Sequence, residues 1–243
     1  MTIKELYRNR IAIILLLLIP TLFYALIVLT TSDRIIAFKL ASISEETFVQ
    51  VSEESESLIF IGLAVVGLLT SFVALNLMQK NFDVNRRLII CGFHSSEIIL
   101  SKLIVLVGVI FLIGLYAALM LLLFFSPEYL LGVLLGFVLG GYVYGCYGLL
   151  IGSIFKHELE GILFIVLLAN IDAGWLQNPI YYAEAQSKII IRYLPAFHPS
   201  QISIISGFTD YSFATSLILS ITYGAVFLIA ALIIFGKRTR IKK

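Results

Sequence analysis

The sequence predicts an all-α integral membrane protein with six transmembrane helices. Of its 243 residues, 60% are hydrophobic and only 13% are charged, and the mean hydropathy is +1.03. Soluble domains are about half apolar and a quarter charged. The apolar residues form runs of about 20, the length that a helix needs to cross a bilayer. No remaining stretch is long enough for a separate soluble domain, so we expect one membrane domain over residues 1–243.

The elements are predicted in order along the chain. The first ten residues, MTIKELYRNR, are expected to form an amphipathic helix at the membrane interface, because apolar and basic side chains separate onto two faces. The acidic stretch Thr31 to Glu56 should be a loop on the outer face. Pro20 should kink the first span. The six predicted spans cover residues 11–30, 58–78, 98–125, 129–155, 159–175 and 211–235.

The fifth span is expected to be broken. Its apolar run from Gly161 to Ala169 is interrupted at Asn170 and Asp172, and nine residues cover only about half of a ~30 Å hydrocarbon core. The chain that follows, up to Asp210, is apolar and aromatic but contains three prolines. Irregular backbone at membrane depth must be covered by protein or line a water-filled cavity. We therefore expect re-entrant helices in the outer leaflet before the sixth span.

The basic residues predict the orientation. With both termini inside, thirteen of the seventeen Lys and Arg residues are cytosolic, whereas ten of the fifteen acidic residues are outside. Cytosolic segments carry an excess of Lys and Arg. We therefore expect a multi-pass protein of the cell membrane with cytoplasmic N and C termini. Lys102, near the start of the third span, should lift its ammonium group back to the interface.

The residues that could carry chemistry are few. The chain has no G-x-x-x-x-G-K-[ST] loop, so we do not expect it to hydrolyse ATP by that route. The three histidines, His94, His157 and His198, are expected in loops, with none one helical turn from another histidine or a cysteine. This spacing argues against a metal site or a histidine-based catalytic site. Asp172 is the only charge expected deep in a span, which disfavours an ion-coupled carrier.

Small and polar residues within the spans suggest how the helices pack and what they transport. Glycines spaced by four residues let two helices approach closely, which suits internal packing or a seam with a second chain; we favour internal packing. The fourth span carries such glycines at positions 132, 136, 140, 141, 145, 148 and 152. The residues proposed for a substrate pathway are the polar side chains in or near the spans, Asn76, Tyr142, Asn170 and Asp172.

The segment between the second and third spans, residues 81–102, holds the densest set of charges before the C-terminal tail. We expect an amphipathic helix from Asp83 to Cys91 on the cytosolic surface. Gly92 should end this helix in a left-handed conformation, and Ser95 or Ser96 should cap the next one. The apolar positions recur at i, i+4 and i+7, at Val84, Leu88 and Cys91.

Two stretches carry a family resemblance. The segment RRLIICGFHSSEIILSKLI resembles the loop between the second and third spans of ABC-2 type permeases, the membrane subunits of bacterial ABC exporters. The segment YLPAFHPSQISIISGF, residues 193–208, is similar to the pattern before the last span of that family. The six spans, the N-terminal amphipathic helix and the broken fifth span agree with it. The resemblance therefore covers nearly the whole chain.

The resemblance implies that the helix from Asp83 to Cys91 is a coupling helix, which docks in a groove of a separate ATPase near its Q-loop. The alternative is an ordinary cytosolic turn whose arginines follow the positive-inside rule. The residues assigned to coupling are Asp83, Val84, Arg86, Arg87, Leu88, Cys91, Gly92, Phe93 and Glu97.

The implied function is export of a hydrophobic or amphipathic substrate, such as a peptide, an antibiotic or other drug, or a lipid. The implied partners are two copies of an ABC ATPase, which would hold ATP and Mg, and a second permease chain in a homodimer or a heterodimer. The chain itself would be no enzyme and would bind no cofactor and no nucleic acid. The alternatives are an ATP-independent membrane enzyme or immunity factor and, ranked last, a secondary carrier.

Overall fold

The computed structural model describes residues 10–39, 48–80, 82–175 and 188–239. It is about 81% helical, and five helices in these ranges are long and apolar enough to cross a membrane. The sequence-based expectation of a largely helical membrane protein is thus confirmed, whereas residues 1–9 of the expected interfacial helix lie outside the described ranges. The five helices are α2 (Arg10–Thr30), α3 (Glu53–Gln79), α5 (Ser95–Leu121), α6 (Leu130–Ile154) and α11 (Ala214–Thr239).

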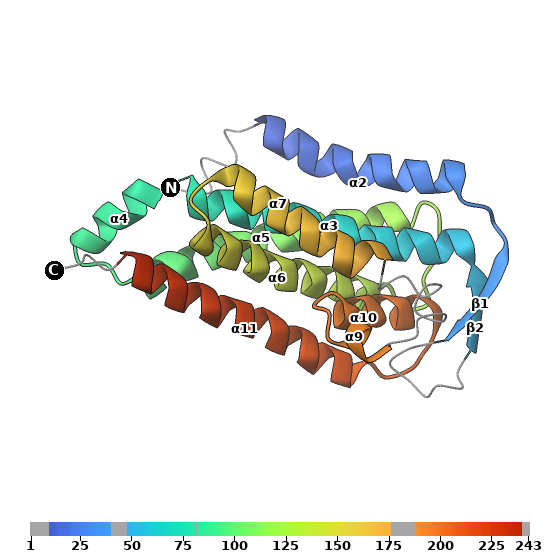
Figure 1. The fold of residues 1–243 in the computed structure, drawn as a ribbon. Coiled ribbons are helices and arrows are strands. Elements are labelled where there is room, and N and C mark those ends of the chain that lie inside the picture. The colour runs from blue at the N-terminus through green and yellow to red at the C-terminus, as the bar shows by residue number, and fades with distance from the viewer. Residues whose placement is uncertain (1–9, 40–47, 81, 176–187, 240–243) are drawn as a thin grey trace.

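Helices α3 and α6 form the centre of the bundle, with α2 and α11 on opposite outer sides (Figure 1). All seven glycines of α6 face other segments of the same chain: Gly148 lies against the Ser71 backbone of α3, and Gly136 against Ser203. The interpretation of these glycines as internal packing positions is therefore confirmed. Many apolar side chains on the outer helices, such as Leu22 and Ile218, are exposed and fit contact with lipid.

The acidic segment between the first two spans is more ordered than a plain loop. Strands β1 (Ile35–Lys39) and β2 (Phe48–Ser52) pair antiparallel, with Ile35 opposite Ser52. Their β-branched and aromatic residues favour a pleated strand. The expectation of an entirely α-helical chain is therefore corrected by one small hairpin.

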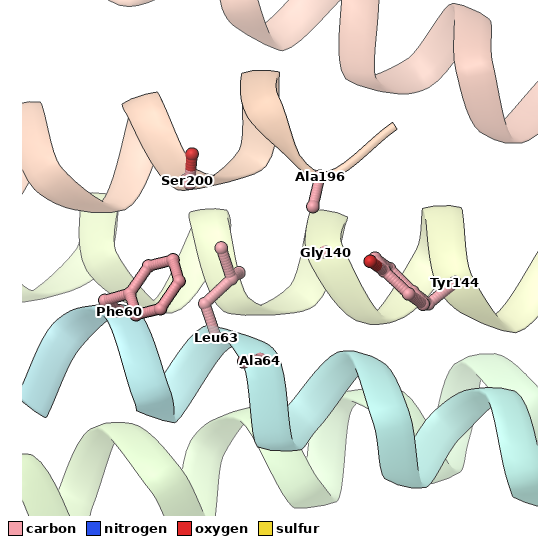
Figure 2. A pocket seen from close by; sticks show the side chains of 7 residues that line it. All are labelled: Phe60, Leu63, Ala64, Gly140, Tyr144, Ala196 and Ser200. Atoms are coloured by element: carbon pink, nitrogen blue, oxygen red, sulfur yellow. The ribbon is translucent and has the colours of Figure 1, made fainter. Parts of the chain in front are cut away.

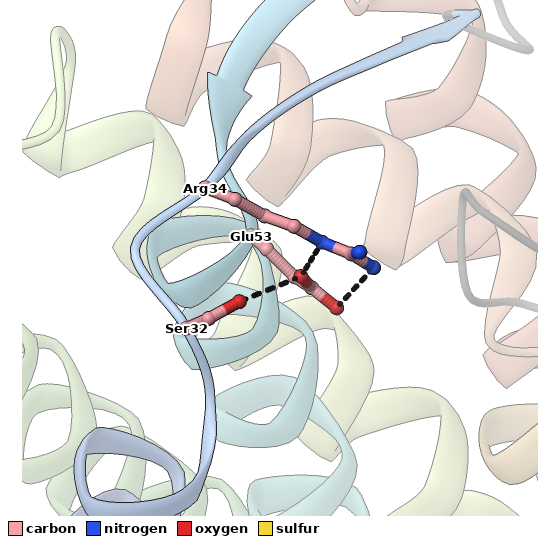
Figure 3. Close-up of polar contacts among 3 residues, drawn as sticks. All are labelled: Ser32, Arg34 and Glu53. Atoms are coloured by element: carbon pink, nitrogen blue, oxygen red, sulfur yellow. Dashed lines mark hydrogen bonds and ion pairs between the residues drawn. The ribbon is translucent and has the colours of Figure 1, made fainter.

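Helix α3 begins at Glu53, so Glu53 to Glu56 belong to a helix and not to the expected loop. Ser52 is the N-cap, and its side chain accepts a hydrogen bond from the Ser55 amide. Figure 3 shows how the start of the hairpin is fastened to this turn: Arg34 pairs with Glu53, and Ser32 donates to the same carboxylate. The hairpin is thereby fixed to the N-terminal end of α3.

The expected break in the fifth span is a change of helix type. Helix α7 (Glu158–Ala169) continues directly into a π-helix, η1 (Asn170–Trp175). Such π-helical turns are rare and occur frequently at functional sites. The chain from 176 to 187 lies outside the described residues.

Two short helices precede the last long one, α9 (Lys188–Arg192) and α10 (Phe197–Phe208). Helix α10 runs antiparallel along the first half of α6: the Tyr129 amide donates to the Ser206 carbonyl, while Gly140 lies near Pro199. It also packs against α3 and α11. Ten of its twelve residues are buried, so the short helix expected before the last span is an integral part of the bundle.

Candidate functional site

The expected helix between the second and third spans is present as α4 (Phe82–Ile90). Figure 1 shows it set apart from the bundle, at the end where α3 and α11 finish and opposite the hairpin. Val84 and Leu88 are 44% and 37% exposed, and the Arg87 side chain is also exposed. Apolar and basic groups are therefore both available to a partner, while the side chains of Asp83 and Arg86 lie outside the described part.

The end of α4 has the geometry expected from Gly92. This glycine has a φ of 102°, the only positive φ among the described residues. Its amide donates to the Ile89 carbonyl and the Phe93 amide donates to the Leu88 carbonyl, the two hydrogen bonds of a Schellman motif. Both bonds are about 3 Å long. The exit from α4 is thus fixed by backbone geometry, and Cys91 and Phe93 on either side remain exposed.

The next helix begins one residue earlier than expected. His94, and neither Ser95 nor Ser96, is the N-cap of α5. The Glu97 carboxylate accepts a hydrogen bond of 3.1 Å from the His94 amide, which is half of a capping box. Glu97, expected to contact the ATPase, therefore has a local role in starting α5.

The Lys102 side chain is turned into the protein. Its side chain is only 4% exposed, and its Nζ donates to the Leu77 carbonyl in the last turn of α3. Carbonyls in the last turn of a helix lack an intrahelical partner and carry negative partial charge. The lysine therefore joins the end of α3, which precedes α4 in the chain, to the start of α5, which follows α4.

A second polar site lies at the junction of η1, α6 and α10. Asp172 is fully buried, and its carboxylate accepts hydrogen bonds from the Tyr144 hydroxyl at 2.7 Å and the Ala196 amide at 2.8 Å. Ala196 is the N-cap of α10, so the carboxylate lies near the positive end of that helix dipole. The side chain holds the π-helix and helix α10 together.

A cavity of about 10 Å³ adjoins this site (Figure 2). That volume suits one water molecule and no larger ligand. The cavity lies between α3, α6 and α10 and has a largely apolar wall with a few polar groups. The lining residues are Phe60, Leu63, Ala64, Gly140, Tyr144, Ala196 and Ser200.

The four residues expected along a substrate pathway are not brought together in this conformation. Asn76 and Asn170 are exposed, and the Asn170 side-chain amide donates to the Val166 carbonyl in the preceding helix, α7. Tyr142 packs against Gly224 of α11. Asp172 is paired with Tyr144 of α6.

Glu56 is a buried acid that the sequence analysis assigned to the outer loop. It is 0% exposed, and neither carboxylate oxygen has a hydrogen-bond partner among the described residues. An unpaired charge is costly to bury. The spacing gives a signal that could have identified it, because Glu56 lies one helical turn before the apolar Phe60 and shares its face.

The histidines form no common site. His94 and His157 are N-caps, whereas His198, expected in a loop, lies in α10 beside the rings of Phe197 and Tyr223. Burial lowers the pKa of His198. Within the described ranges, no three His, Cys, Asp or Glu side chains are grouped so that they could hold a metal ion.

Comparisons with known proteins assign no family. No family model matches the chain, and no curated protein matches it.

Proposed function

We propose that this chain is the permease subunit of an ATP-driven exporter, working with a separate ABC ATPase. The observation that carries the proposal is the position and composition of α4. This helix projects from the end of the bundle, exposes Val84, Leu88 and Arg87, and directly follows the central helix α3 (Figure 1). A partner pressing on α4 would act on the best-buried span of the molecule.

The proposed topology has six crossings, with both termini in the cytosol. Helix α7 has 12 residues and η1 has 6, which at about 1.5 Å per residue extends about 27 Å, close to the ~30 Å core. These two elements would form the fifth crossing. Lys237 and Arg238 at the end of α11 lie at the α4 end, and the acidic start of α3 lies at the other, as the positive-inside rule requires.

The proposed assembly contains two permease chains and two ATPase subunits in the cell membrane, with ATP and Mg held by the ATPases. Closure of the ATPase pair would push the α4 helices together and repack the spans. The cargo would be hydrophobic or amphipathic, a peptide, a drug or a lipid, because the bundle offers mainly apolar and aromatic surfaces. It would leave near the re-entrant helix α10.

The test is to purify the permease from its native membrane and measure any associated ATPase activity. A variant with Arg86→Gln, Arg87→Gln and Leu88→Ala should lose stimulated ATPase activity while keeping its helical content. The matched control carries Lys156→Gln, Glu158→Gln and Leu159→Ala, which removes two exposed charges and one exposed leucine side chain at the start of α7, at another place on the proposed cytosolic side. Full stimulation by the folded α4 variant would refute the proposal.

An ion-coupled carrier is the second candidate function. The observation in its favour is the Glu56 carboxyl group, which lies buried in α3 and has no hydrogen-bond partner in the part of the chain that the structure describes. Buried acids of this kind in membrane proteins commonly bind a transported proton or cation. Transport into ATP-free vesicles driven by an ion gradient, and lost in Glu56→Gln, would establish the carrier and exclude the exporter.

A further inference from the structure

Hydrogen bonds from side chains to main-chain carbonyls join the ends of the helices near α4. Lys102 of α5 supplies the first, to the Leu77 carbonyl of α3. Leu77 is in the last turn of α3, so its carbonyl has no partner within that helix. Because α4 connects these two helix ends, a displacement of α4 acts on both, and Lys102 opposes their separation.

The same chemistry recurs at the end of α6. Arg238, near the end of α11, donates from Nη1 to the Ser153 carbonyl at 2.9 Å and to the Phe155 carbonyl at 3.3 Å. A weaker contact reaches Ile154 at 3.4 Å. A cation at the negative end of a helix is favourable. Arg238 thereby fastens α11 to α6 as Lys102 fastens α5 to α3.

Gln79 connects the α3–α5 pair of helices to the α6–α11 pair. It is the last residue of α3, and its Nε2 donates to the Phe155 carbonyl and to the His157 carbonyl, both at 3.3 Å. The Phe155 carbonyl therefore accepts from both Gln79 and Arg238. A continuous series of contacts runs from α5 through α3 and α6 to α11.

We propose that Lys102, Gln79 and Arg238 form a latch that makes these four helix ends move together with α4. The two cations are positioning residues in the proposed coupling, since neither needs to touch the ATPase. The inference rests on the proposed function for the source of the movement, and it identifies the residues that would transmit it. The exposed surface of α4 would bind the partner, and the latch would pass the displacement to the spans.

The mechanical part of the proposal can be tested on the permease alone. Spin labels on native Cys91, which is exposed after α4, and on Ile233→Cys, exposed on α11, report the separation of the two elements. Cys146 is buried and should not label. The parent protein should give one narrow distance distribution. Lys102→Met should broaden it, whereas Lys80→Met, which removes an exposed charge at the same end of α3, should leave it unchanged.

The functional part is tested in the complex with the ATPase. The Lys102→Met and Arg238→Gln variants should still bind the ATPase. Each should stimulate ATPase activity about tenfold less than the parent protein does, which is the factor expected for the loss of one charged hydrogen bond. Lys237→Gln, an exposed neighbour of Arg238, is the matched control. A purely structural role would lower thermal stability and ATPase binding together.

The outcomes separate the two proposals. If the parent protein carries no ATPase, the proposed function fails, and the spin-label distances still decide whether the latch exists. If Lys102→Met leaves both the distance distribution and the stimulation unchanged, the latch is refuted while the ATPase partnership stands.

Discussion

Replacement of Gly148 by alanine tests how tightly the two central helices are packed. A Cβ atom at this position would lie 2.3 Å from the Ser71 carbonyl oxygen and 2.9 Å from the Ser71 Cα. Contacts below 3.0 Å essentially never occur for a Cβ atom, and here the obstacle is backbone. Helix α6 would have to move away from α3 by several tenths of an ångström over their shared interface.

Gly108→Ala in α5 is the control that separates the cost of overpacking at Gly148 from the helix preference of alanine. A Cβ atom at Gly108 would meet nothing within 4 Å, so this substitution only adds the helix preference of alanine, about 1 kcal/mol. Gly148→Ala gains the same preference and adds the overpacking cost of about 1–3 kcal/mol. The free energy of unfolding should therefore be lower in Gly148→Ala than in Gly108→Ala by about 1–3 kcal/mol.

Reversible unfolding in mixed micelles with increasing SDS, followed by circular dichroism, measures this difference. Equal free energies of unfolding for the two variants would show that α3 and α6 are not in backbone contact at Gly148, and the assignment of the α6 glycines to internal packing would be wrong.

Three further predictions concern the ends of the bundle and its buried polar site. Gly92→Ala should destabilise the end of α4 by about 1–2 kcal/mol, because an L-residue resists a positive φ, and hydrogen exchange of the Phe93 amide should accelerate while the spans stay protected. Tyr144→Phe leaves the buried Asp172 carboxylate without one donor and should lower the free energy of SDS unfolding by about 1–3 kcal/mol; unchanged stability would contradict the pairing. Arg34→Gln should cost under about 1 kcal/mol in thermal unfolding and lose even that effect at 1 M salt, because Arg34 is largely exposed.

The sequence predicted the helices well, for a physical reason. Runs such as residues 130–154 are too apolar to be anything but buried or in lipid, and their length is set by the bilayer. The helix α4 and the left-handed Gly92 followed from local rules that need no tertiary contact. These features depend on the chain near each residue, which is why periodicity and composition identified them.

The missed features depend on contacts between distant segments. Lys102 was expected at the interface because lysine stems commonly extend there, and only the fold brings it to the orphan Leu77 carbonyl. Glu56 was assigned to a solvated loop because its neighbours are acidic, yet α3 starts before it and buries it. The π-helix at Asn170 was expected only as an interruption, since its hydrogen-bond pattern cannot be deduced from composition.

The geometry at Gly92 has a consequence for chemical modification of the chain. A φ of 102° is natural for a residue of the opposite chirality. D-alanine, introduced there by semisynthesis, would accept the turn while reducing the conformational freedom of the unfolded segment. The mirror-image residue would hold the exit from α4 more firmly than glycine does, and L-alanine of identical composition would loosen it. Position 92 thus allows the stiffness of the α4 exit to be changed in either direction by chirality alone.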